Sequence, residues 1–282
     1  MSFATVPDLI LGPMVKAALM ADLGSYGDVT TRAVIPADTT YTARLNARED
    51  AVVSGMQIAA LAFRLVDQSL EIVTQITDGA RASKGDTLME IKGSAASILS
   101  AERVALNYAG RLTGIATKTA GFVAEAEGTE ARITCTRKTT PNMRLVEKLA
   151  VLHGGGHNHR YSLSDAILIK DNHIAAAGGV RQVLEATKRH ASHMMAVEIE
   201  VDRLDQLKDV LEVGGASVVL LDNMDNDQLH EAVAMVNGAM KTEASGNVTL
   251  DRIASIAATG VDYISSGALT HSARTVDLGL DF

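Results

Sequence analysis

The sequence predicts an α/β protein with two parts, an α+β part over residues 1–115 followed by a βα barrel. Two observations support this fold class. After residue 130, six short strand-like runs alternate with five helical patterns, as in βαβ units stacked around a parallel sheet. Before that point, strand and helix patterns follow one another without this alternation. The chain therefore changes architecture near its middle.

The first part begins with an amphipathic helix expected over 7–24, followed by an ordered loop over 24–38. Alternating or β-branched runs predict strands, and a polar turn is expected over 79–86. These strands are expected over 40–50, 51–55, 71–76 and 86–93, with a helix over 57–66. Ser94 is a candidate cap of a further helix that continues through 100–110. Gly110 and Gly114 weaken that helix and suggest that another segment packs closely on it.

The second part contains strands expected over 131–136, 166–170, 196–201, 217–222, 241–245 and 262–266. Helices are expected over 141–152, 180–190, 204–213, 226–236 and 250–259. An open doubly wound sheet would also explain this rhythm. We favour a closed or nearly closed barrel because almost every strand ends in charged or small polar residues, where barrels place their working groups. The alternative is that the strand ends are polar only because they are exposed to solvent.

The run AVEIEV at 196–201 places Glu198 and Glu200 on one face of its strand, because side chains alternate. If the intervening apolar residues pack against helices, both carboxylates face the barrel interior. Buried carboxylates of like charge need cations or hydroxyl groups as partners. The alternative is an edge strand whose acidic face is solvated.

The run GGGHNHR at 154–160 combines three glycines with His157, His159 and Arg160. One glycine suffices to end the preceding helix, so three suggest that the backbone approaches something closely. A flexible linker and a solvated turn are the alternatives. Farther along, Ser-Gly pairs at 245–246 and 266–267 follow the last two strands, where barrels commonly hold phosphate.

Charge and cysteine content narrow the class of protein. The net charge of −8 argues against a nucleic-acid partner, yet the window 137–170 carries +4, which suggests a focused site for a small anion. The single Cys135 excludes an intrachain disulfide and fits a reducing cytoplasm. The first 13 residues show no signal-peptide pattern, and no apolar run reaches membrane-spanning length. We therefore expect a cytoplasmic protein.

Residues 136–174, TRKTTPNMRLVEKLAVLHGGGHNHRYSLSDAILIKDNHI, closely resemble the signature segment of the quinolinate phosphoribosyltransferase family. Further motifs follow in the family's order: GDVTT (27–31), ERVALN (102–107), LTGIATKT (112–119), VEIEVD (197–202), LLDN (220–223), EASGN (243–247) and GVDYISSGALTHS (260–272). The resemblance thus extends over almost the whole chain. Two departures are Asn142, where glycine is common, and Asn247, which replaces a frequent second glycine.

The resemblance implies an N-terminal α+β sandwich domain over 1–115, joined by the C-terminal tail 270–282, and an incomplete, seven-stranded-type α/β barrel over 116–269. It implies a magnesium-dependent transferase of de novo NAD biosynthesis. The family joins quinolinate to phosphoribosyl pyrophosphate and releases pyrophosphate and carbon dioxide, giving nicotinate mononucleotide. It also implies a homodimer in which each active site borrows a residue from the partner.

Site residues carried over from the family fall into four groups. Arg103 is expected to reach quinolinate across the dimer, and Arg137, His159 and Arg160 to complete that pocket. Lys138 and Lys170 are expected between quinolinate and pyrophosphate. Glu200 and Asp222 are expected to hold the ribose hydroxyls and the magnesium-bound end, with magnesium held indirectly through the substrate. The expected 5′-phosphate cradle comprises Ser245, Gly246, Asn247, Ser266 and Gly267.

Of these residues, Lys138, Lys170, Glu200 and Asp222 are the expected catalytic groups. The proton donor that follows decarboxylation is left open among Lys138, Lys170 and water. Three other functions are alternatives. They are a related molybdenum-cluster protein of the same fold, a Schiff-base aldolase using Lys170, and a phosphometabolite-binding barrel without catalysis.

Overall fold

The computed structural model describes residues 5–282, and the chain forms two compact units. The first unit contains the chain through Ala120 together with Thr140–Gly155 and Ala273–Phe282. The second unit contains Gly121–Thr139 and Gly156–Ser272. This division differs from the expected boundary at 115/116 because that boundary falls inside the 31-residue helix α4 (Ala95–Glu125), which continues from one unit into the other. Residues 1–4, part of the segment tested for a signal peptide, lie outside the described residues.

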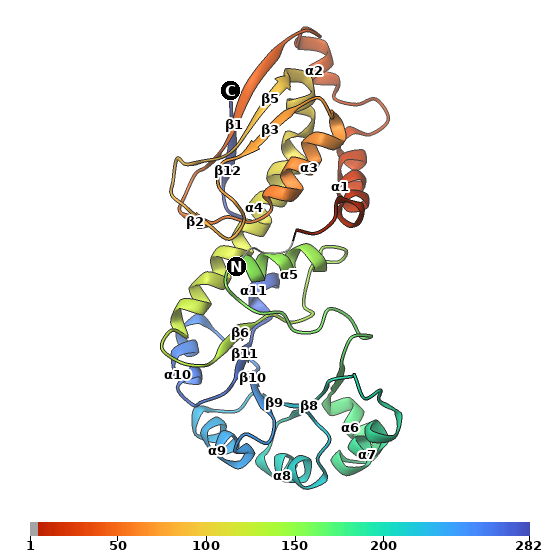
Figure 1. Ribbon diagram of the computed structural model, residues 1–282, viewed down its shortest axis with the longest axis vertical. Coiled ribbons are helices and arrows are strands. Elements are labelled where there is room, and N and C mark those ends of the chain that lie inside the picture. Colours follow the sequence, from red (N-terminus) through yellow and green to blue (C-terminus); the bar gives the residue numbers. More distant parts are fainter. Residues whose placement is uncertain (1–4) are drawn as a thin grey trace. The chain divides into compact units, whose positions relative to one another are not determined.

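The first unit is built on a four-stranded antiparallel sheet with the strand order β12-β1-β5-β3. Its strands are β1 (Thr40–Ala47), β3 (Glu71–Thr74), β5 (Thr87–Ser94) and β12 (Leu278–Asp281). One face is buried, as the alternation of Ala43, Leu45 and Ala47 with more exposed neighbours shows. Helices α1 (Asp8–Leu23), α3 (Met56–Val66) and α4 belong to the same unit (Figure 1).

Two elements of the first unit were not predicted. A short helix, α2 (Val29–Val34), occupies the expected loop because the Asp28 carboxylate accepts a hydrogen bond from the Thr31 backbone N–H and caps it. In the expected turn at 79–86, β4 (Arg81–Ala82) pairs with β2 (Ala51–Val52). Both elements are too short for a periodic sequence pattern to reveal them.

Helix α4 carries glycines where other segments of the first unit cross it. A Cβ atom at Gly110 would lie 2.7 Å from the carbonyl oxygen of Val276, and one at Gly114 would collide with the carbonyl of Arg274. The predicted close packing on these glycines is therefore confirmed, and the packing segment is the C-terminal tail. The Ser94 hydroxyl accepts from the Ser97 N–H at 3.3 Å, as expected of a cap.

Helix α5 (Arg144–His153) also packs in the first unit, although its residues were expected in the barrel. The fully buried Glu147 pairs with Arg111 of α4 at 2.9 Å. Gly154 ends α5 where a side chain would collide with the Ala116 carbonyl of α4, and Gly155 takes a φ of 83°. The predicted close approach at the glycines is therefore confirmed for Gly154, and its partner is helix α4.

The second unit contains a six-stranded parallel sheet in the order β6-β11-β10-β9-β8-β7, which confirms the predicted α/β architecture around a parallel sheet. Among residues 5–282 this sheet has six strands and not the seven that the resemblance implied, and β6 and β7 are its two edges, so it does not close. Its strands are β6 (Arg132–Thr134), β7 (Ile167–Ile169), β8 (Val197–Val201), β9 (Val218–Asp222), β10 (Lys241–Ser245) and β11 (Tyr263–Ser265). All six were predicted. His157 adds an isolated parallel bridge to Thr134 at the edge of β6.

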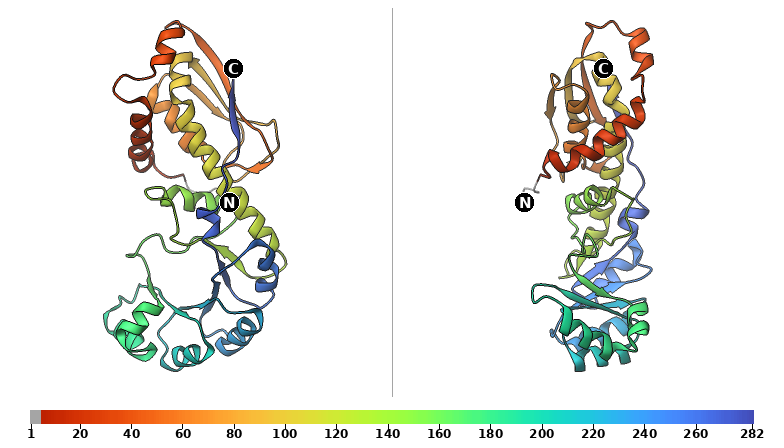
Figure 2. Two further views of the ribbon diagram at one scale, coloured as in Figure 1. Left: turned by 180° about the vertical axis from the view of Figure 1, so that it is seen from behind. Right: turned by 90° about the vertical axis from the view of Figure 1, so that its right-hand side faces the viewer.

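Helices lie on the outer side of this curved sheet, as Figure 1 and the left view of Figure 2 show. They are α6 (Asp171–Ala177), α7 (Val180–His190), α8 (Leu204–Val213), α9 (Asn226–Val236) and α10 (Ile253–Ala257), with a 3-10 turn at Leu250–Arg252. The short helix α11 (Ala268–His271) instead lies at the carboxyl end of β11 (Figure 1). The predicted bounds of α7, α8 and α9 are those observed. The short helices α6 and α11 were not predicted. Among residues 5–282, no helix has both the length and the apolar character needed to cross a bilayer.

Candidate active site

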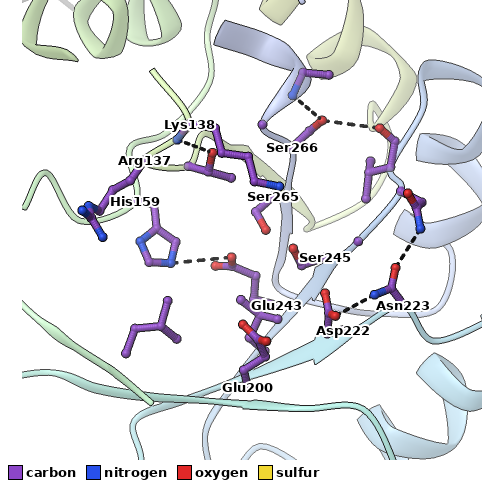
Figure 3. Close-up of a pocket in the computed structure, with 18 of the residues that line it drawn as sticks. Arg137, Lys138, His159, Glu200, Asp222, Asn223, Glu243, Ser245, Ser265 and Ser266 are labelled. Carbon is purple, nitrogen blue, oxygen red and sulfur yellow. Dashed lines mark hydrogen bonds and ion pairs between the residues drawn. The ribbon is translucent and has the colours of Figure 1, made fainter. Parts of the chain in front are cut away.

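A cavity of about 770 Å³ opens at the carboxyl ends of the parallel strands, entirely within the second unit (Figure 3). Every expected site residue except Arg103 lines it. Arg103 lies on α4 in the first unit, with its side chain exposed. The cavity thus lies where the polar residues at the predicted strand ends indicated a site.

The cationic side of the cavity consists of residues in the segments that follow strands or the bridge at His157. Arg137 and Lys138 follow β6, Arg160 follows His157, and Lys170 follows β7. Burial lowers the pKa of the Arg160 guanidinium, and the nearby charge of Arg137 lowers it further. Arg160 Nη1 donates to the Ala166 carbonyl at 2.9 Å, whereas its buried Nε has no hydrogen-bond partner among the described residues. Two neighbouring guanidinium groups of this kind suit a ligand with more than one carboxylate.

The acidic side comprises Glu200 at the end of β8 and Asp222 at the end of β9. Burial raises the pKa of the Glu200 carboxyl, the Lys170 charge opposes this, and the Asp222 charge adds to it. Lys170 Nζ lies 3.4 Å from Glu200 Oε2. Lys170 thus pairs with a carboxylate and is about half exposed, whereas a Schiff-base lysine is activated by desolvation or by a neighbouring cation.

The third side of the cavity is formed by the turns that follow β10 and β11. Gly246 and Asn247 have φ values of 89° and 48°, which fold the chain tightly after Ser245. Ser266 and Gly267 follow β11, and a Cβ atom at Gly267 would lie 2.8 Å from Lys138 Cδ. The main chain is therefore exposed toward the cavity at the two Ser-Gly pairs.

His159 is engaged on both ring nitrogens. Its Nδ1 accepts a hydrogen bond from the Arg160 backbone N–H at 2.8 Å, and its Nε2 lies 2.9 Å from Glu198 Oε2. Glu243 Oε1 lies 3.7 Å from the same Nε2 (Figure 3). An Nδ1 that accepts and an Nε2 that donates define one tautomer of the neutral ring. His159 was expected to contact quinolinate. In the structure it also links the Arg160 backbone to the carboxylate of Glu198.

Glu198 and Glu243 form the floor beneath His159. Each side chain is more than nine-tenths buried, and Oε1 of each has no hydrogen-bond partner among the described residues. Burial, and then the charge of Glu198, raise the pKa of Glu243 to about 7, while His159 acts in the opposite direction. The prediction that Glu198 and Glu200 share the interior face is confirmed, since Glu198 is buried and Glu200 lines the cavity.

Sequence reasoning missed several residues that line the cavity: Thr136, Leu168, Leu220, Asn223, Glu243, Ser265 and His271. Strand alternation would have found three of them, Leu168, Leu220 and Glu243, because each precedes an expected site residue by two positions on a predicted strand. Glu243 precedes Ser245 by two residues on β10 and is the register partner of Leu220, which in turn pairs with Glu200 on β8. Asn223 and His271 lie outside the strands, so no periodic pattern marks them.

Comparison with known proteins gives the family. The N-terminal domain model of quinolinate phosphoribosyl transferase matches residues 28–113, and the C-terminal domain model matches residues 115–281. The chain belongs to the quinolinate phosphoribosyltransferase family.

Individual members of the family are similar over nearly their whole length. Quinolinate phosphoribosyltransferase [decarboxylating] 1b of Nicotiana tabacum is 43% identical over 97% of this chain and 83% of its own. A probable nicotinate-nucleotide pyrophosphorylase [carboxylating] of Bacillus subtilis is 37% identical over 97% of this chain and 93% of its own. The solved structure of the nicotinate-nucleotide pyrophosphorylase from Francisella tularensis superposes with a TM-score of 0.94 at 36% identity, covering 100% of this chain and 99% of that one.

The buried pair Glu198–Glu243 predicts an unusual dependence of stability on pH. With a folded-state pKa of about 7, Glu243 keeps its proton between pH 4.5 and 7, where the unfolded chain has released it. The stability that Glu243 contributes therefore falls as pH rises through this window, by roughly 3 kcal/mol at most. Glu243→Gln removes the ionisation, so its free energy of unfolding should lose this decline.

Urea denaturation at pH 5, 6, 7 and 8 measures the effect. Glu231→Gln, an exposed glutamate of α9, serves as the matched control and should follow the wild-type profile. If the free energies of unfolding of wild type and Glu243→Gln changed with pH in the same way, Glu243 would not be protonated in the folded state.

Proposed function

We propose that this chain transfers the phosphoribosyl group of phosphoribosyl pyrophosphate to quinolinate with decarboxylation. The products are nicotinate mononucleotide, pyrophosphate and carbon dioxide, and the reaction belongs to de novo NAD biosynthesis. The observation that carries the proposal is one cavity in which Arg137, Arg160, Lys138 and Lys170 surround a floor of carboxylates, in a chain of this family. The aldolase, molybdenum-cluster and non-catalytic alternatives gain no support from these findings.

Quinolinate is a dianion, and the Arg137–Arg160 pair matches it. Each guanidinium presents a planar fork that binds a carboxylate through two parallel hydrogen bonds. The partly buried position of Arg160 strengthens such a bond, because water competes less there. A bound carboxylate also relieves the mutual repulsion of the two arginines.

Phosphoribosyl pyrophosphate would occupy the rest of the cavity. The Ser245–Asn247 and Ser266–Gly267 turns offer hydroxyl groups and open main chain for the 5′-phosphate, and Lys138 and Lys170 lie where they can neutralise pyrophosphate. Departure of pyrophosphate leaves an oxocarbenium-like ribose. Glu200 and Asp222 would orient the ribose hydroxyls and stabilise this positive charge.

Magnesium fits the acidic side of the cavity. Glu200 and Asp222 supply the oxygen ligands that this ion prefers, and the Asp222 charge already raises the pKa of Glu200. A cation bound between the substrate and these carboxylates would relieve their repulsion. When bound, magnesium supplies charge neutralisation for the pyrophosphate leaving group.

Bond formation needs no covalent enzyme intermediate. The pyridine nitrogen attacks the anomeric carbon as the bond to pyrophosphate breaks, and the ring becomes cationic. The bond between C2 and its carboxylate then breaks, the electron pair stays on the ring carbon, and carbon dioxide leaves. A proton from Lys138, Lys170 or water restores the aromatic C–H. Much of the catalysis is then positioning and electrostatic stabilisation.

A homodimer in which the partner's copy of Arg103 completes the quinolinate pocket is part of the proposal. Arg103 is exposed on α4, so its guanidinium is available to another chain. Large apolar side chains on α1, α2 and the segment between them are also exposed: Leu9, Ile10, Met20, Tyr26, Val29 and Val34. Exposed apolar groups of this size favour association with another protein surface. A cytoplasmic location is proposed from the single buried Cys135.

The proposed reaction is tested by mixing the protein with magnesium, phosphoribosyl pyrophosphate and quinolinate. We expect nicotinate mononucleotide and carbon dioxide in equal amounts. Arg160→Ala should lose at least about tenfold in quinolinate affinity, because a charge-assisted bidentate contact disappears. Arg181→Ala, which removes an exposed arginine of α7, is the control and should behave as wild type. Pyrophosphate release without carbon dioxide, or no turnover at all, would contradict the proposal.

The borrowed arginine is tested by mixing two inactive variants, Arg103→Ala and Asp222→Asn, under conditions that exchange subunits. A heterodimer then contains one cavity with its own Asp222 and the partner subunit's Arg103, so roughly a quarter of wild-type activity should return. Steady-state turnover of the mixture measures this. If Arg103 acted within its own chain, the mixture would stay inactive.

A further inference from the structure

Asn223 follows β9 directly and is not among the residues expected at the site. Its backbone has a φ of 55°, a conformation that asparagine tolerates better than most side chains. Its backbone N–H donates to the Ser245 carbonyl at 2.9 Å, which joins the ends of β9 and β10. The side chain therefore starts from a point between Asp222 and the turn after β10.

Both polar atoms of the Asn223 amide are used. Nδ2 donates to Asp222 Oδ2 at 2.6 Å, and Oδ1 accepts from Asn247 Nδ2 at 2.9 Å (Figure 3). A carboxylate only accepts hydrogen bonds, so the amide nitrogen must face Asp222 and the amide oxygen must face Asn247. The two contacts thus fix the orientation of the amide as well as its position.

The same side chain lies against Gly246. A Cβ atom at residue 246 would collide with Asn223 Oδ1 and lie 2.6 Å from Cγ, and Gly246 has a φ of 89°. Residue 246 is therefore restricted to glycine both by its backbone and by Asn223. The turn from Ser245 to Asn247 and the side chain of Asn223 form one packed assembly.

We propose that Asn223 is a positioning residue that sets the separation between the Asp222 carboxylate and the turn Ser245–Asn247. This inference rests on the proposed function, in which these two features hold the ribose hydroxyls and the 5′-phosphate of one substrate. Their separation must match the length of a sugar phosphate. The β9–β10 ladder fixes the backbone of both strands, whereas the direct contact with Asn223 Nδ2 holds the Asp222 side chain.

The need for such a contact follows from the charges around Asp222. Glu200 lies on the adjacent strand β8 and lines the same cavity, so the two carboxylates repel each other. A hydrogen bond from a neutral amide holds Asp222 in place without cancelling its charge. Asparagine alone combines a short side chain, tolerance of positive φ, and one donor with one acceptor.

Two substitutions separate the roles of the amide. Asn223→Ala removes both contacts. It should raise the KM for phosphoribosyl pyrophosphate and lower kcat, each by about tenfold, and leave the affinity for quinolinate unchanged. Asn223→Asp keeps the oxygen that accepts from Asn247 but replaces the donor to Asp222 with a repelling carboxylate. It should lower kcat by about tenfold or more and retain the affinity for inorganic phosphate within about twofold, because the contact with Asn247 remains.

Steady-state kinetics and calorimetry with quinolinate and inorganic phosphate give these constants. Asn237→Ala is the matched control, since Asn237 also has a positive φ, 43°, at the C-terminus of α9 and lies outside the cavity lining. It removes an asparagine from the same kind of backbone and should leave kcat and both KM values unchanged.

Three results would overturn the inference. Wild-type constants in both Asn223 variants would show that the contacts do not matter. An equal loss in Asn237→Ala would assign the effect to backbone strain. Loss of inorganic phosphate binding in Asn223→Asp would indicate that Asn223 contacts the phosphate itself. Failure of the wild-type protein to turn over quinolinate would instead refute the proposed function, so the two failures are distinguishable.

Discussion

The site depends on holding Arg137 and Arg160 near each other in a partly buried place, although their charges repel. Burial and the neighbouring charge both lower the pKa of Arg160, so the cationic form is maintained at a cost. Glu198 and Asp165 offset part of that cost by raising the same pKa. Such a pair is stabilised by an anion, and a ligand with two carboxylates meets both guanidiniums together.

The parallel sheet makes this arrangement available. Side chains at register partners on adjacent strands point to the same face, so Glu200, Leu220 and Glu243 lie in one layer across β8, β9 and β10. Asp222 and Ser245 form the next layer toward the strand ends. His159 connects the loop that carries Arg160 to Glu198 and to Glu243 of the first layer. The hydrogen-bonded pairing of β8, β9 and β10 therefore also sets the spacing between the cations and the carboxylates.

Much of this organisation was readable in the sequence, and the rest was not for identifiable reasons. Long periodic segments such as 180–190 and 226–236 were predicted within their observed bounds, because a buried stripe of several turns dominates their pattern. Helix α2 has only six residues and depends on a cap by Asp28, so periodicity does not reveal it. The glycines at 154 and 155 were connected with the site, yet Gly154 clears space for α4, a partner distant in sequence. Asn223 was missed because its role depends on Asn247, which only the folded turn brings beside it.

The most direct test of the paired arginines compares two ligands that differ by one carboxylate. Quinolinate and nicotinate share the pyridine ring, but nicotinate lacks the 2-carboxylate. The thermal unfolding midpoint should rise markedly with quinolinate and much less with nicotinate at the same concentration, because only the dianion engages both guanidiniums. Equal shifts for the two ligands would contradict the account, as would the absence of any shift with quinolinate.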